Sequence, residues 1–195
     1  TCALPIYENH FSVDGKKINY SAEDYIENVD WNGADLLICA TGIKKNVNGA
    51  QNLIKKNIIK KAVVTHASEK VDKTIIMGVN ENDYNNKKDH LLSSSICDAN
   101  AVAQALYHID NKWGIKNCFF TTLHPWLSYQ NLVDGTLKSI SSPGHFWKDY
   151  ALGRSATESM IPKLTTASSA VIDVLPNLNK KIDAISFRTP TAIVS

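Results

Sequence analysis

Short apolar runs in the first half of the chain are separated by a segment with helical spacing. Asp35 to Ala40, Lys61 to Thr65 and Thr74 to Val79 are largely apolar runs. Such runs predict strands of a parallel sheet with both faces buried. Apolar residues of the segment Ala50 to Ile59 recur at helical spacing, namely Leu53, Ile54, Ile58 and Ile59. The strand, helix, strand order predicts a right-handed βαβ unit, which places ligands at the carboxyl ends of its strands.

A turn signal precedes these runs, and a helix signal opens the second half of the chain. Phe11 to Tyr20 contains Val13-Asp14-Gly15, which predicts a hairpin turn. Ala99 to Trp113 carries apolar residues on one face and is followed by Gly114. We therefore expect a helix there, with Asp98 as its N-cap.

Further apolar runs and one polar stretch complete the second half. Strands are predicted at Lys116 to Thr122, Ile182 to Phe187 and Thr191 to Ser195. His124 falls just beyond the end of the first of these. Gly135 to Trp147 is rich in Ser, Gly and Pro, which predicts a long loop. A helix is expected from about Thr166 until Pro176 stops it. The whole pattern is typical of an α/β protein.

Composition and charge narrow the classes of partner. Apolar residues make up 44% of the 195 residues and charged residues 21%, which excludes a disordered chain and allows one domain or two partial ones. The net charge is +2 and the lysines are scattered, so we expect no nucleic-acid partner. The apolar runs are far shorter than a bilayer span, so we expect no membrane partner. The cysteine spacing favours free thiols, which makes a reducing cytoplasm the expected location.

One cysteine and one histidine are the strongest candidates for chemistry. Cys97 stands just before a helical pattern, and His124 follows a strand-like run. A helix N-terminus and a basic neighbour together convert a thiol into a nucleophilic thiolate. The alternative is an inert buried thiol and a strand-end histidine. The cysteines lack the paired C-x-x-C spacing of zinc sites, so free thiols and no metal are expected: Cys2, Cys39, Cys97 and Cys118.

Several ordered motifs resemble those of the phosphorylating glyceraldehyde-3-phosphate dehydrogenase family. The resemblance runs from about Phe11 to Ser195, and the gap between Cys97 and His124 is the one that the family uses. The motifs are Ala40-Thr41-Gly42, Lys60 to Ala67 (KKAVVTHA), Met77-Gly78-Val79-Asn80, Cys97 with Asn100, Thr121-Thr122-Leu123-His124, and Phe187-Arg188-Thr189-Pro190-Thr191. The resemblance implies a partial Rossmann-like nucleotide-binding unit over residues 1–96, followed by part of an α+β mixed-sheet catalytic domain over residues 97–195.

The resemblance also implies a reaction and an assembly. Cys97 would attack an aldehyde carbonyl, with His124 as base and then as hydrogen-bond donor to the oxyanion. A hydride would pass to NAD or NADP, and a thioester would remain. Relatives of this family form homo-oligomers, usually tetramers.

Individual residues inherit expected binding roles from the same resemblance. Arg188 matches the arginine that holds the substrate's phosphate. Asp98 and Thr165 stand where the family handles phosphate groups. At the cofactor, the resemblance places Thr41, Gly42 and Thr65.

The phosphate-handling positions depart from the family pattern. Ile96 and Asp98 replace the Ser and Thr that flank the catalytic cysteine in the family, and Leu127 replaces a threonine. Like charges about 4 Å apart repel by about 4 kcal/mol at an effective dielectric of about 20, which outweighs hydroxyl hydrogen bonds of about 1 kcal/mol each. No G-x-G-x-x-G motif occurs, so we expect either that the sequence is an excerpt of a longer protein or that the chain cannot bind dinucleotide in the family's way.

These departures leave different functional hypotheses open. The first is an aldehyde dehydrogenase of this type whose thioester goes to water or to a non-phosphate acceptor. A related form acts on a longer sugar phosphate such as erythrose 4-phosphate. The alternative is a catalytically impaired paralogue that serves as a binding or assembly module.

Overall fold

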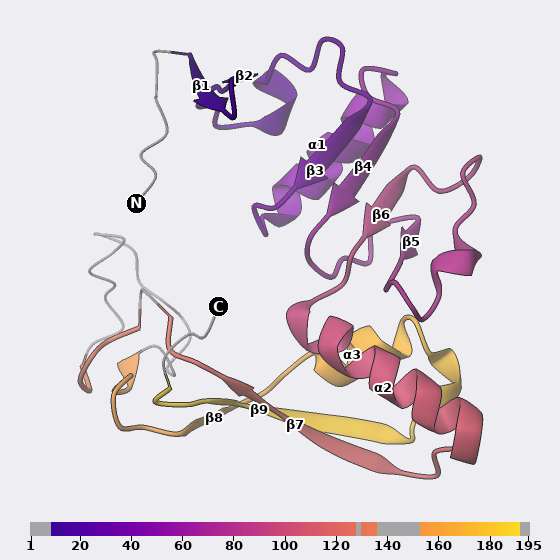
Figure 1. Cartoon of the computed structure of the whole chain (residues 1–195), viewed down its shortest axis with the longest axis vertical. Helices are drawn as coiled ribbons and strands as arrows, with labels where there is room; N and C mark the ends of the chain where they lie inside the picture. Colours follow the sequence, from indigo (N-terminus) through magenta and orange to yellow (C-terminus); the bar gives the residue numbers. More distant parts are fainter. Residues whose placement is uncertain (1–8, 128–129, 136–152, 192–195) are drawn as a thin grey trace. The chain divides into compact units, whose positions relative to one another are not determined.

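The computed structural model describes residues 9–127, 130–135 and 153–191 (Figure 1). Contacts divide the chain into two compact units. The first consists of Thr1–Ile75 and Asp83–Ser94, and the second of Ile76–Asn82 and Ser95–Ser195. The predicted loop over Gly135 to Trp147 and the predicted strand over Thr191 to Ser195 lie largely outside the described residues. The assignment of 1–96 and 97–195 as two domains stays a prediction.

A hairpin opens the described part of the first unit. Strands β1 (His10–Val13) and β2 (Lys16–Asn19) pair antiparallel. The connecting residues Asp14 and Gly15 both have positive φ, 49° and 76°. An Asp-Gly pair with this backbone matches the right-handed twist of the strands that it joins. The predicted hairpin is confirmed.

The main sheet of the first unit is the predicted parallel βαβ arrangement. Its strands lie in the order β3-β4-β6-β5 and all pair parallel. The bounds are β3 Leu36–Cys39, α1 Lys44–Lys55, β4 Lys61–Val64, β5 Lys73–Thr74 and β6 Leu91–Ser93. The apolar face of α1 packs on β3 and β4 through a buried cluster that includes Val47, Leu53, Leu37 and Val64.

Several boundaries in this unit differ from the sequence prediction. Helix α1 covers Lys44–Lys55, so Ile58 and Ile59 lie beyond its end. Strand β3 buries only alternate residues, and Leu36 and Ile38 are 51% and 66% exposed. Of the strand predicted at Thr74 to Val79, only Thr74 is in a strand. The chain turns after it because Gly78 adopts a φ of +80°. Strand β6 was not predicted, because its run is too short to stand out.

The second unit is a mixed sheet covered on one face by two helices (Figure 1). Strands β7 (Cys118–His124) and β9 (Ile182–Arg188) pair parallel, and β8 (Ile161–Lys163) pairs antiparallel with β9. Helices α2 (Cys97–Trp113) and α3 (Ala167–Ile172) share one buried core. Phe120 packs against that core, whereas Phe119 and Leu123 face the other way and are 64% and 65% exposed.

Two predictions about the ends of elements are wrong in this unit. Ile96, not Asp98, occupies the N-cap position of α2, and no side chain caps the helix. Asp98 lies in the first turn instead, and its carboxylate turns toward the sheet rather than toward the helix backbone. His124 is the last residue of β7 rather than a residue beyond it.

The fold class is therefore the expected one. A parallel, partial Rossmann-like α/β unit comes first, and an α+β unit with a mixed sheet follows. Among the described residues, no helix is long and apolar enough to cross a membrane.

Candidate active site

Cys97 is the first residue of α2, and a sharp turn leads into it. Ser95 has a φ of 62°, a conformation that residues other than glycine seldom adopt, and it is buried. Ile96 then returns to an extended conformation as the N-cap. Cys97 follows this turn and is exposed at the helix N-terminus. A thiol in that position experiences the positive end of the helix dipole.

Asp98 and His124 form the closest polar pair beside this thiol. His124 Nε2 lies 2.9 Å from Asp98 Oδ1, and Cys97 Sγ lies 3.8 Å from the same oxygen. The ligand-forming atoms of these three residues all lie within 4.8 Å of one another. Asp98 is 8% exposed, so its carboxylate interacts with His124 with little screening by water. The structure thus brings together the predicted nucleophile and the predicted base, with a carboxylate between them.

Hydroxyl groups hold the second oxygen of that carboxylate. Thr122 and Thr165 each place Oγ1 3.4 Å from Asp98 Oδ2 as a donor. Ser186 Oγ lies 2.7 Å from Thr122 Oγ1. Thr165 Oγ1 also accepts from the Ala167 amide at 3.1 Å, which fixes its position at the start of α3. The carboxylate is therefore oriented, with Oδ1 toward the thiol and the imidazole and Oδ2 toward the hydroxyls.

Sequence reasoning missed Thr122 and Ser186. A signal was present, because residues two apart on a strand share a face, and Thr122 stands two before His124. Ser186 is the register partner of Thr122 on the neighbouring strand. That register depends on long-range pairing, which no local pattern reveals.

Arg188 is the register partner of His124 at the carboxyl ends of β7 and β9. Its Nη1 donates to the Pro125 carbonyl at 3.3 Å, and the side chain is half-buried. The next residue, Thr189, binds the His124 carbonyl through both its amide (2.8 Å) and its hydroxyl (3.1 Å). These bonds fix the two strand ends against each other, and Arg188 and His124 occupy neighbouring register positions on the same face of the sheet.

The predicted cofactor residues gather at one edge of the first unit. Thr41 and Gly42 follow β3, and Thr65 follows β4, its parallel neighbour. The Thr65 amide donates to the Cys39 carbonyl at 3.1 Å, and Asn46 Nδ2 donates to Thr41 Oγ1 at 3.0 Å. Gly42 has a φ of +68° and open space where a Cβ would stand. The carboxyl ends of parallel strands are the edge at which open α/β sheets bind their ligands, and all three predicted cofactor residues lie there.

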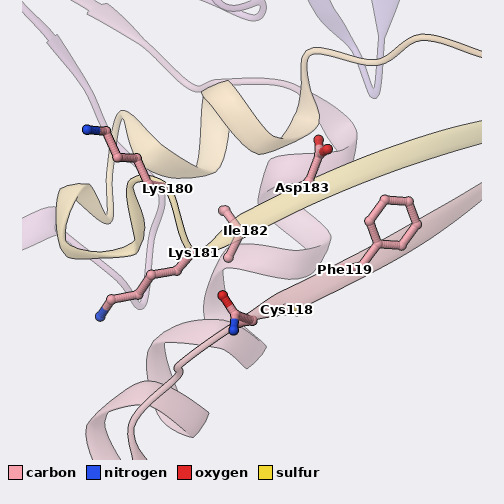
Figure 2. Close-up of a pocket in the computed structure, with 7 residues that line it drawn as sticks. Cys118, Phe119, Lys180, Lys181, Ile182 and Asp183 are labelled. Atoms are coloured by element: carbon pink, nitrogen blue, oxygen red, sulfur yellow. The ribbon is translucent and has the colours of Figure 1, made fainter.

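A hollow of about 500 Å³ lies elsewhere in the second unit (Figure 2). It is lined by Asn117, Cys118, Phe119, Lys180, Lys181, Ile182 and Asp183. These residues stand at or beside the amino ends of β7 and β9, whereas His124 is at the carboxyl end of β7. At about 3.3 Å per residue, the two ends of β7 are about 20 Å apart. The hollow is therefore separate from the Cys97 site, and in Figure 2 the side chains of Lys180 and Lys181 diverge.

Comparison with known sequences agrees with this geometry. Residues 96–195 match the sequence profile described as glyceraldehyde 3-phosphate dehydrogenase, C-terminal domain. The matched part begins one residue before Cys97 and contains the whole Cys97, Asp98 and His124 cluster. The chain therefore belongs to the glyceraldehyde-3-phosphate dehydrogenase family.

Relatives from distant organisms match nearly the whole chain. A protein of Chlamydomonas reinhardtii named glyceraldehyde-3-phosphate dehydrogenase, cytosolic, is 34% identical over 95% of this chain and 52% of its own length. The glyceraldehyde-3-phosphate dehydrogenase of Serratia odorifera is 33% identical over 99% of this chain and 62% of its own length. That of Geobacillus stearothermophilus is 33% identical over 96% of this chain and 53% of its own length. The chain thus spans little more than half the length of these relatives.

Proposed function

We propose that the natural protein is an aldehyde dehydrogenase of the glyceraldehyde-3-phosphate dehydrogenase type, with Cys97 as nucleophile. One observation carries the proposal. The exposed Cys97 sulfur stands at the N-terminus of α2, with the His124 imidazole and the Asp98 carboxylate all within 4.8 Å. An accessible thiol beside an oriented imidazole is the arrangement that covalent catalysis needs.

The residues of this chain have separable tasks in the reaction. The Cys97 sulfur attacks the carbonyl carbon and its proton leaves through His124, which then donates to the oxyanion. Asp98, 2.9 Å from His124 Nε2, sets the orientation of the imidazole. NAD or NADP, when bound, accepts the hydride from the substrate carbon. Thr41, Gly42 and Thr65 are the residues proposed to hold that cofactor.

The acceptor of the acyl group is proposed to be water rather than phosphate. The buried Asp98 carboxylate lies 3.8 Å from the sulfur, where it repels an incoming dianion. Two like charges about 4 Å apart repel by about 4 kcal/mol at an effective dielectric of about 20. Water carries no charge and meets no such barrier. Its oxygen bonds to the acyl carbon, the carbon–sulfur bond breaks, and a carboxylic acid and the free thiol are released.

The substrate is proposed to be a phosphorylated aldehyde. Arg188 is anchored beside His124 by its bond to the Pro125 carbonyl, and its charge suits a phosphate at the far end of a sugar phosphate. A longer substrate such as erythrose 4-phosphate fits this proposal when hydrolysis replaces phosphorolysis.

Thiol labelling of the complete natural chain tests the nucleophile. We expect iodoacetamide to label Cys97 at least about tenfold faster than free cysteine, because its sulfur is exposed at a helix N-terminus beside an imidazole that can take its proton. Cys118, at the far end of β7, is the internal reference. Labelling of Cys97 no faster than of Cys118 would reject the proposal.

A second experiment tests the acceptor of the acyl group. Reduced cofactor should form equally fast with and without inorganic phosphate, and the product should be the free acid.

A binding or assembly module remains a second candidate, and one observation favours it. His124 Nε2 lies 2.9 Å from Asp98 Oδ1, so this nitrogen is paired with the carboxylate rather than with the thiol. Calorimetric titration of the complete chain with NAD and NADP separates the candidates. Binding of either nucleotide favours the enzyme, and no heat of binding favours the module.

We further propose that the protein assembles as a homo-oligomer, as a tetramer by analogy with the family. The face of the β7-β9-β8 sheet opposite the helices exposes Phe119 and Leu123, and Leu164, just after β8, is 96% exposed. Apolar exposure of this kind favours burial against another protein surface. A Phe119→Lys variant should elute later from a sizing column than the natural protein, with unchanged circular dichroism. An unchanged elution position would show that this face is not the contact.

A cytosolic location is proposed on two grounds. The Chlamydomonas relative carries that location in its name, and Cys39, Cys97 and Cys118 are free thiols, as a reducing compartment maintains them. Cell fractionation with an antibody to the chain tests this, and recovery in a membrane or secreted fraction would overturn it.

A further inference from the structure

We propose that Cys97, Asp98 and His124 form a zinc-binding site, and that zinc held there blocks the thiol. The three side chains offer a thiolate sulfur, a carboxylate oxygen and an imidazole nitrogen from two different elements, α2 and β7. These are the three ligand types that zinc takes in proteins. The absence of C-x-x-C spacing predicted no such site, because that pattern detects only ligands arranged as pairs of cysteines.

The distances suit a tetrahedral ion. Zinc bonds of about 2.3 Å to sulfur and about 2.0 Å to nitrogen or oxygen place neighbouring ligand atoms roughly 3.3–3.6 Å apart. His124 Nε2 and Asp98 Oδ1 are 2.9 Å apart, and Asp98 Oδ1 and Cys97 Sγ are 3.8 Å apart. The remaining separation, between the Cys97 sulfur and the imidazole nitrogen, is within 4.8 Å, and the Cys97 side chain that must close it is exposed.

The groups behind the ligands prepare the carboxylate for a metal. Thr122 and Thr165 bind Asp98 Oδ2, and Ser186 supports Thr122. These bonds leave Oδ1 directed at the sulfur and at Nε2, which is the work of outer-shell partners in metal sites. Cys97 is exposed, so a fourth tetrahedral position opens to solvent.

The donor set selects the kind of ion. Thiolate and imidazole favour zinc over magnesium or calcium, which prefer oxygen ligands alone. On binding, the thiol proton is released to solvent and the sulfur bonds to the metal. Zinc and an aldehyde therefore compete for one sulfur, and occupation of the site inhibits any reaction of Cys97. The inference concerns binding and does not depend on turnover.

Site-resolved labelling of the complete natural chain tests the proposal. The protein is stripped with a chelator and titrated with zinc chloride, and the iodoacetamide labelling rates of Cys97 and Cys118 are measured by mass spectrometry of their peptides. We expect one zinc per chain to lower the labelling rate of Cys97 at least about tenfold and to leave that of Cys118 unchanged. Magnesium, as the control ion, should change neither rate. An unchanged Cys97 rate, or equal slowing of both cysteines, would overturn the proposal.

Variants locate the ligands. Asp98→Thr should raise the zinc concentration for half-protection at least about tenfold, and Thr165→Val by a few fold, because outer-shell partners also tune affinity. Asp183→Asn, at the far end of the sheet, is the matched control and should leave it unchanged. Circular dichroism verifies folding, and Thr165→Val still decides the matter if Asp98→Thr unfolds. If Asp98→Thr and Thr165→Val both reach half-protection of Cys97 at the same zinc concentration as the natural protein, the assignment of Asp98 as a zinc ligand is overturned.

Failure of this inference is distinguishable from failure of the proposed function. The labelling rate of Cys97 in the stripped protein reports on the nucleophile alone. The ratio of rates with and without zinc, in the same sample, reports on the metal alone. If Cys97 is labelled slowly without zinc but is protected by zinc, the proposed function fails and the zinc site stands. If Cys97 is labelled fast and zinc does not change that rate, the zinc site fails and the proposed function stands.

Discussion

The two ends of the β7-β9 pair differ in what their side chains do together. At the carboxyl end, buried Asp98 joins a sulfur, an imidazole and two threonine hydroxyls in one network. At the amino end there is a hollow of about 500 Å³, lined in part by Lys180 and Lys181, whose side chains diverge (Figure 2). A catalytic site needs functional groups that point toward one another and hold one another in place. The side chains at the carboxyl end do so, and the two lysines at the amino end do not.

The difference follows from the topology. In a parallel pair both strands present their carboxyl ends at the same edge, where loops collect polar residues. Here the N-terminus of α2 meets that edge, so the helix contributes Cys97 and Asp98 to the ends of β7 and β9. The amino ends meet the loops after α2 and before β9 instead, which supply exposed lysines.

The largest expected effect separates the two cysteines of this sheet. If Cys97 is the proposed nucleophile, Cys97→Ala should lower the rate of aldehyde oxidation at least about a thousandfold, because the sulfur that would form the thioester is removed. Cys118→Ala, at the opposite end of β7, should change the rate by less than about twofold. Steady-state formation of reduced cofactor by the complete chain measures both. Equal losses in the two variants would remove the functional distinction between the ends.

The next effect concerns the cations at the two ends. Arg188→Ala should raise the KM for a phosphorylated aldehyde at least about tenfold with little change in kcat, because it removes a charge-assisted contact to the distal phosphate. Lys181→Ala should leave KM unchanged. An unphosphorylated aldehyde of the same length is the control, since its KM should not respond to either variant. A matched rise for that control would show that Arg188 only supports the fold.

A smaller effect tests the repulsion assigned to Asp98. Asp98→Thr should raise the Cys97 labelling rate by about tenfold, because a negative charge beside the thiolate is removed and the imidazole is released. Inorganic phosphate, which should not affect the natural protein, should then accelerate turnover. The measurement compares the turnover of the natural protein and of Asp98→Thr, each with and without inorganic phosphate. A decrease in labelling would mean that Asp98 orients His124 more than it repels anions.

The sequence predicted the composition of the site better than its connections. Cys97 and His124 were visible because Cys97 stands just before a helical pattern and His124 follows a strand-like run, and the spacing between them matches a known family. The prediction that Asp98 is the N-cap of the helix was wrong. It was made because a short polar residue next to the start of a helix is commonly its cap. Its carboxylate instead finds Thr122, Thr165 and His124, which are distant in sequence, and only the tertiary fold brings them together.

The same limit applies to the fold. The βαβ order and the hairpin followed from local patterns, because periodicity and an Asp-Gly turn act over a few residues. The exposure of Leu36 and Ile38 did not follow, because a continuous apolar run does not say how many faces of a strand are covered. The strand predicted through Val79 failed because Gly78 turns the chain, and an isolated glycine is a weak signal in sequence.

The smallest expected effect concerns Ser186, the outermost hydroxyl of the network. Ser186 is 6% exposed and lies 2.7 Å from Thr122 Oγ1. Ser186→Ala should lower the free energy of unfolding by about 1 kcal/mol, because one buried hydrogen bond is lost and the Thr122 hydroxyl retains Asp98. Ser169→Ala, on the exposed side of α3, is the matched control and should have no effect. Urea unfolding measures both. Equal stability of the two variants would mean that the network ends at Thr122, and that the carboxylate is oriented by the threonines alone.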